Sequence, residues 1–207
     1  PAELEARHTL SSDLGGRIVR DRLWFYGGVS RSRNREQVLG AYKPDGSPAL
    51  DDKLSVWVNG KVSYQATKNH KLVGFEQLQH KGAVRNVTQF VPWESRVFQD
   101  LWGSTAKGEW QAVWGSSLVT NVYGGIWYWH SPFIGQTDKP STLDLTTQQV
   151  TGMSVTNAGA GEDPLERNYP FKATMSLYKP DLFMGNHEFK GGLDFVDSLI
   201  SRRRESH

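Results

Sequence analysis

One string in this 207-residue chain has the residue types of a nucleophilic site, Ser104-Thr105-Ala106-Lys107. It matches the Ser-x-x-Lys pattern of serine acyltransferases. That chemistry needs a helix, whereas this string lies where a loop meets a predicted strand. Ser and Lys are also frequent enough here for a chance match. We therefore predict that the protein is not an enzyme and that it has no catalytic residue.

Histidines and carboxylates do not form a metal-binding pattern either. The chain has no Cys, and no two of its six His residues have a spacing such as His-Glu-x-x-His. Several carboxylates fall in or near residues 131–168, where their oxygens could suit Ca²⁺, but EF-hand spacing is absent. We interpret this segment as a solvated acidic loop, and we predict no metal site and no cofactor. The carboxylates are Asp138, Asp144, Glu162, Asp163 and Glu166.

Aromatic residues give the better candidates for binding. A run at 127–129 could stack on sugars, but an interfacial aromatic girdle of a membrane protein is the preferred interpretation. A second group falls in a predicted loop, where aromatic residues have no girdle role, so these are candidate ligand contacts; packing within the loop is an equal alternative. The interface group is Trp127, Tyr128 and Trp129, and the ligand group is Phe90, Trp93, Arg96 and Trp102.

The elements that must position these residues are long alternating strands. From Leu54 to Ala66 every second residue is apolar or Gly, and the residues between are polar apart from Trp57. A period of two places the two sets on opposite faces of a strand. Similar patterns predict eight strands near residues 4–12, 22–33, 53–66, 70–81, 105–114, 118–130, 169–179 and 187–197.

The connections between these strands alternate in length. Short ones at 14–21, 67–69, 115–117 and 180–186 alternate with long ones at 34–52, 82–104 and 131–168. Short turns at one end and long loops at the other are typical of an outer-membrane barrel. We therefore predict an all-β, antiparallel, up-and-down membrane β-barrel of about eight strands, with residues 1–207 as a single partial barrel domain. A short strand at 142–150 would belong to a loop.

Composition agrees with this fold class. The formal net charge of +2 gives no basis for nucleic acid binding, and no run of about 18 apolar residues exists for a spanning helix. We expect the polar strand faces to line the lumen of the barrel. The lumen candidates are Lys61, Gln65, Lys107, Glu109, Lys172, Glu188, Lys190 and Asp194.

Three stretches resemble a known family. Residues 14–27 (LGGRIVRDRLWFYG) are similar to the Leu-Gly-Gly-Pro-Ile turn, basic-Asp-basic step and aromatic strand of TonB-dependent outer-membrane receptors of the Oar-like type, with Arg17 in place of Pro. Residues 69–74 (NHKLVG) resemble the family's turn into a strand. Residues 185–195 (GNHEFKGGLDF) resemble its His-x-Phe-Lys-x-Gly-x-x-Phe strand.

The resemblance implies a transport function. It implies a bacterial outer-membrane receptor that takes up a large solute such as a siderophore, glycan or peptide. Its partners would be membrane lipid, the unknown solute, and an inner-membrane energy-coupling protein that acts through a plug domain not seen in this chain. The expectation is a fragment with the first eight or so strands of a larger barrel. Two alternatives stay open: a self-contained small outer-membrane barrel with a structural or adhesin role, and a soluble β-barrel or sandwich that binds a ligand.

Overall fold

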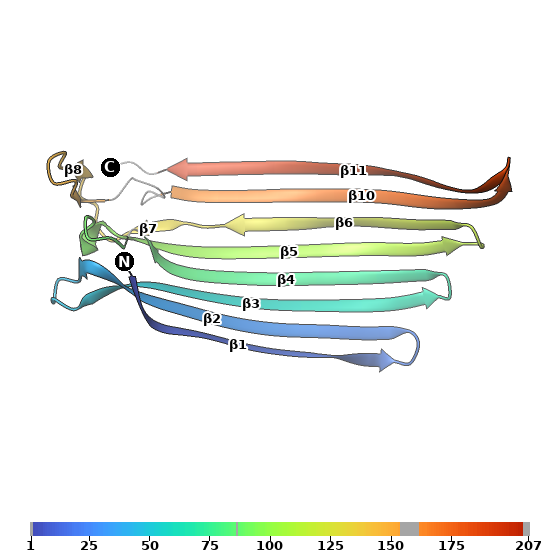
Figure 1. Ribbon diagram of the computed structural model, residues 1–207, viewed down its shortest axis with the longest axis horizontal. Helices are drawn as coiled ribbons and strands as arrows, with labels where there is room; N and C mark the ends of the chain where they lie inside the picture. Colours follow the sequence, from blue (N-terminus) through green and yellow to red (C-terminus); the bar gives the residue numbers. More distant parts are fainter. Residues whose placement is uncertain (1, 86, 154–161, 205–207) are drawn as a thin grey trace.

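The computed structural model describes residues 2–85, 87–153 and 162–204, and their long strands form one extended antiparallel sheet (Figure 1). Each long strand pairs with the next long strand along the chain, so the topology is a simple meander. The short turns lie at one end of the sheet and the long connections at the other (Figure 1). The long strands are β1 (Ala2–Val19), β2 (Leu23–Tyr42), β3 (Pro48–Thr67), β4 (His70–Arg85), β5 (Val97–Trp114), β6 (Leu118–His130), β10 (Glu162–Leu182) and β11 (Gly185–Arg204).

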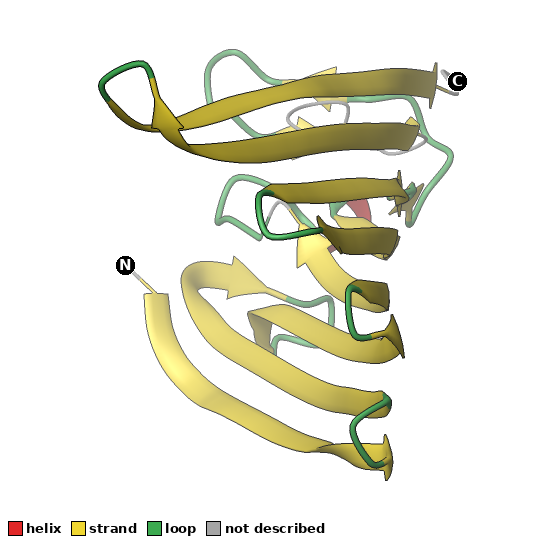
Figure 2. Cartoon of the chain, turned by 90° about the vertical axis from the view of Figure 1, so that its right-hand side faces the viewer, coloured by secondary structure: helices red, strands yellow, loops and turns green. Residues whose placement is uncertain are grey.

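The predicted fold class is confirmed as an all-β, antiparallel, up-and-down sheet. Within the described residues β1 and β11 stand at opposite edges of the strand order, so the sheet curves but does not close (Figure 2). Long unpaired edges promote aggregation in water, and in a bilayer their backbone groups would lack hydrogen-bond partners. No helix in the described part of the chain is long and apolar enough to cross a membrane.

Most of the strands are longer than the alternation predicts. The connection predicted at 34–52 shrinks to a turn at 43–47, and β5 begins at Val97, within the connection predicted at 82–104. The predicted turn at 14–21 is also shorter, because β1 continues to Val19. The alternation pattern misses these added residues because both faces of the strand are polar or of mixed polarity there. Cross-strand ion pairs hold such residues in the sheet, as between Arg33 and Asp52, whose side-chain atoms approach to 2.6 Å.

Gly15 shows why two glycines do not end the first strand. Gly15 pairs directly with Tyr26 on β2. A Cβ on Gly15 would lie 3.2 Å from both the Tyr26 ring and the Phe25 carbonyl oxygen. The glycine is therefore a place where an aromatic ring covers the neighbouring backbone, rather than a strand breaker.

The register separates two faces along the whole sheet. Directly paired residues share a face, and the pairs Val29–Val58 and Val58–Leu78 define an apolar face across β2, β3 and β4. We call this the outer face. The opposite one, which carries Lys61 and Lys107, is called the inner face.

The connections at the loop end fold over the inner face. Along the start of β5, Val97, Gln99 and Leu101 are buried, whereas their outward neighbours Phe98 and Trp102 are exposed. The 3₁₀ turn η1 (Trp93–Ser95) leads into β5, and β7 (Phe133–Gly135) pairs with β5 beside it in the sheet. Met153, from the connection that follows β7, joins Val97 and Phe133 in a buried apolar cluster. The segment predicted as a loop strand at 142–150 instead forms a small hairpin of β8 (Thr142–Leu143) and β9 (Val150–Thr151).

Candidate functional site

The inner face of the sheet, which we also call the inner wall, carries the polar residues that the alternation pattern predicts to line a lumen. All eight lumen candidates lie on the inner face by register. One row runs across four strands, in which Glu109 pairs with Tyr123, Tyr123 with Lys172, and Lys172 with Asp194. The prediction that these residues share a face is therefore confirmed.

Charges on this wall are paired along and across strands. The Lys107 Nζ lies 2.8 Å from Glu109 Oε2 and 5.3 Å from the centre of the Tyr123 ring. The Lys172 Nζ donates to Asp194 Oδ2 at 2.9 Å. Such a wall offers charged hydrogen-bond donors and acceptors to a polar occupant. Within the described residues no three His, Asp or Glu side chains gather to hold a metal ion.

The loop end holds a compact cluster around Arg96. Its side chain is almost completely buried, and its guanidinium lies 5.1 Å from the centre of the Trp93 ring, where the cation faces the π-system. Burial lowers the pKa of Arg96 below the usual arginine value. The Gln136 side-chain amide donates to the carbonyl oxygens of both Trp93 and Arg96, which ties this turn to the connection after β7.

Further contacts join the two long connections. The Lys139 ammonium reaches Glu94 at 3.2 Å, and the Val150 amide donates to the Phe90 carbonyl oxygen. Backbone amides of Thr147 and Thr146 donate to the Asp144 carboxylate, which holds the pKa of Asp144 below its ordinary value. These bonds give the loop end a defined shape above the inner wall.

The four predicted ligand contacts do not form one group. Trp93 and Arg96 meet in the loop cluster, but Arg96 is buried under its neighbours and has little surface to offer a ligand. Phe90 lies in the same connection and is 47% exposed. Trp102 is not in a loop. It lies on β5 and faces outward, and its ring stacks on the His80 ring with 4.2 Å between the ring centres. Its loop assignment was wrong because the strand begins eight residues before the alternation becomes regular.

The three predicted interface aromatics divide between the faces. Tyr128 pairs with Ser104 and Arg167 on the outer face, and the Arg167 guanidinium lies 5.8 Å from the centre of its ring. Trp127 and Trp129 point to the inner face, because successive residues of a strand alternate. Of the three, only Tyr128 is therefore on the outer face.

Glu76, on the outer face, is a candidate site residue that the sequence pattern did not predict. Glu76 has the same parity on β4 as Leu72 and Leu78, and so it shares their outward, exposed face. The Ser104 hydroxyl donates to its carboxylate at 2.6 Å. The signal was present in the sequence as a charge at an apolar position of the alternation.

Comparison with known proteins gives the fold a counterpart. No model of a known protein family matches the sequence, and no curated protein matches it. Two chains among the solved structures match the fold. One is the crystal structure of the outer membrane transporter YddB from Escherichia coli, with a TM-score of 0.70 over 93% of this chain and 14% sequence identity. This chain spans a quarter (25%) of the transporter's length. The sheet described here thus has the fold of part of an outer-membrane transporter barrel.

Proposed function

We propose that this chain is part of the barrel wall of a TonB-dependent receptor in the bacterial outer membrane. The observation that carries the proposal is the two-faced meander. Its inner wall is charged and hydrogen-bonded, and its outer face is apolar between the short turns and the level of the Arg33–Asp52 pair. The likeness to a transporter barrel supports it, as do the three stretches that resemble Oar-like receptors. The open edges of β1 and β11 favour a larger barrel over a closed eight-stranded one.

The proposed work is energised uptake of a large solute, such as a siderophore, glycan or peptide. The inner wall would border the path of the solute or face a plug domain, and the loop cluster around Trp93 would contribute to selection at the outer mouth. Energy would come from an inner-membrane protein that couples through the plug. No chemistry on the solute is part of this proposal.

Uptake assays test the proposal directly. A strain that lacks the gene, and a strain that lacks the energy-coupling protein, are each supplied with siderophores, glycans or peptides as the sole source of iron, carbon or nitrogen. We expect both strains to lose growth on the same solute, and the full-length gene to restore it in the first. Unchanged growth on every solute, together with altered adhesion or envelope integrity, would contradict transport.

A fractionation experiment separates the membrane interpretation from the soluble one. The full-length protein should sediment with outer membranes and should aggregate when detergent is removed. A protein that stays monomeric in water without detergent would be a soluble β-sheet protein, and the transport proposal would fall with that result.

A further inference from the structure

Glu76 occupies the centre of the apolar outer face. It pairs with Ala106 on β5, and Ala106 lies four residues from both Trp102 and Trp110. On β4, the residues paired with these two tryptophans are His80 and Leu72. Aromatic residues mark the edges of a lipid-facing band about 25 Å tall, so Glu76 lies near its midplane.

A carboxylate near the middle of a lipid-facing surface is unusual and needs a physical explanation. Ionisable groups inside a membrane are unfavourable unless they have partners, and they mark functional sites by default. The Ser104 hydroxyl supplies one hydrogen bond, whereas a carboxylate has about four lone-pair positions that can accept. Glu76 is exposed on the outer face, so a further donor can reach it only from outside this sheet.

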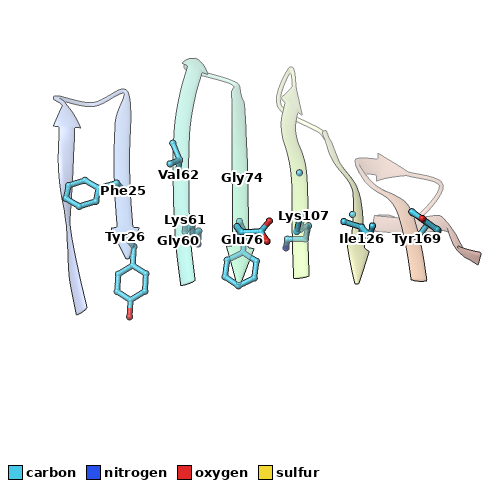
Figure 3. A pocket seen from close by; sticks show the side chains of 14 residues that line it. Phe25, Tyr26, Gly60, Lys61, Val62, Gly74, Glu76, Lys107, Ile126 and Tyr169 are labelled. Atoms are coloured by element: carbon cyan, nitrogen blue, oxygen red, sulfur yellow. The ribbon is translucent and has the colours of Figure 1, made fainter. Parts of the chain in front are cut away.

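An apolar groove of about 840 Å³ surrounds Glu76 (Figure 3). Nine of its fourteen lining residues belong to the outer face, and the other five adjoin outer-face residues in the chain. Phe25, Val62, Ile126 and Tyr169 border it (Figure 3). The groove crosses the strands from β2 to β10, so it is a property of the assembled sheet.

The floor of the groove consists of glycines that the fold itself does not need. A Cβ placed on Gly60, Gly74 or Gly108 meets nothing within 4 Å, and none of the three has a positive φ. Glycine in a strand interior weakens the strand, so an internal explanation is lacking. Small residues on a membrane-facing surface let another backbone approach closely.

The chemistry of the groove selects its occupant. Lipid acyl chains carry no hydrogen-bond donor at the middle of the bilayer, so they cannot supply further hydrogen bonds to the Glu76 carboxylate. We propose that the groove docks a membrane-spanning segment of a second protein, which presents a hydrogen-bond donor to Glu76 and lies against the glycine floor. This inference rests on the outer face being in the membrane, as the proposed function has it, but not on which solute is transported.

Photocrosslinking in the native cells tests the docking site. A benzophenone amino acid is placed at Ile126, in the groove, and in a matched variant at Leu193, which is on the same face but outside the groove. We expect an adduct with one other protein from Ile126 and none from Leu193. Mass spectrometry of the adduct should locate the crosslink in a membrane-spanning segment with a Ser, Thr, Asn, Gln, Lys or Arg residue.

Substitutions then show whether Glu76 and the floor make the contact. We expect Glu76→Leu to reduce the adduct about tenfold, the factor given by the loss of one hydrogen bond in a membrane. Gly108→Val fills the groove and should abolish the adduct. Gly191→Val is the control, because Gly191 is an outer-face glycine outside the groove with the same open space above it. A comparison of gel mobility between heated and unheated samples confirms that each variant is folded in the membrane.

Several results would overturn the inference. These are an adduct with lipid alone, an adduct with a second copy of this chain, no adduct, or a protein adduct that persists unchanged in Glu76→Leu. If solute uptake remains normal in such a case, the docking site fails and the transport proposal stands. A protein absent from the outer membrane would overturn both.

Discussion

A pair of arginine substitutions on β4 gives the sharpest test of which face meets lipid. Leu78 is 51% exposed on the outer face, between Val58 and Ser104. Gln77, its neighbour in the chain, lies on the inner face between Asn59 and Thr105. The two side chains lie at nearly the same depth, so Leu78→Arg and Gln77→Arg differ mainly in the environment of the new charge.

The expected size follows from the depth of Leu78. It lies two residues from the Glu76–Ala106 pair that marks the middle of the band, which is about 5 Å in height for a strand tilted by about 40°. An arginine on the lipid face costs about 2–4 kcal/mol at the midplane and about 0–1 kcal/mol at the interfaces. We therefore expect Leu78→Arg to lower the free energy of unfolding by about 2–3 kcal/mol. That is a factor of about 30 to 140 in the folding equilibrium. For Gln77→Arg we expect a change below about 1 kcal/mol.

Urea unfolding of the full-length protein in lipid vesicles measures both changes. Tryptophan fluorescence reports the transition, and a shifted midpoint with an unchanged slope identifies a change in stability. Equal effects of the two substitutions, or a larger effect of Gln77→Arg, would refute the face assignment. If water bathed the outer face, both variants would fall within about 0.5 kcal/mol of the wild type.

Three further predictions concern the inner wall and the loop end. Trp93→Ala removes the ring over the buried Arg96 guanidinium; we expect a local loss of about 1–2 kcal/mol, seen as faster proteolysis of the external loops on intact cells while the barrel remains folded. Lys172→Gln breaks the ion pair between Lys172 and Asp194, whose side chains are 40% and 58% exposed, so the free energy of unfolding in urea should fall by no more than about 0.5 kcal/mol. A loss above about 2 kcal/mol would show that another domain covers this part of the wall. The folded pKa of Asp144 is lowered, so its contribution to the turn it caps is present above the unfolded value near 4 and is lost as pH falls through the folded pKa. The protection factors of the two capped amides, which compare their hydrogen exchange with the intrinsic rate at the same pH, should therefore fall in that window. Asp144→Ala should lower these protection factors at neutral pH.

Part of the site could be predicted because face assignment is a local property. The parity of Lys61, Lys107 and Asp194 against their apolar neighbours is visible in each strand separately, and the register preserves it. The loop candidates were harder. The sequence predicts a loop at Trp102 because polar and aromatic residues alternate weakly before Thr105, whereas the backbone partners of Trp102 on β4 and β6 show that the strand continues.

The amino-acid sequence by itself determined the class of the fold. Alternating polarity over long strands, with short and long connections in turn, specifies a two-faced antiparallel meander, because side chains of a strand alternate whatever surrounds them. The tertiary structure decided which residues became neighbours across strands, since register depends on every hairpin at once. It placed Ser104 beside Glu76, aligned Gly60, Gly74 and Gly108 beneath one groove, and buried Arg96 under the loops. Those contacts join residues that are distant in sequence, and no local pattern encodes them.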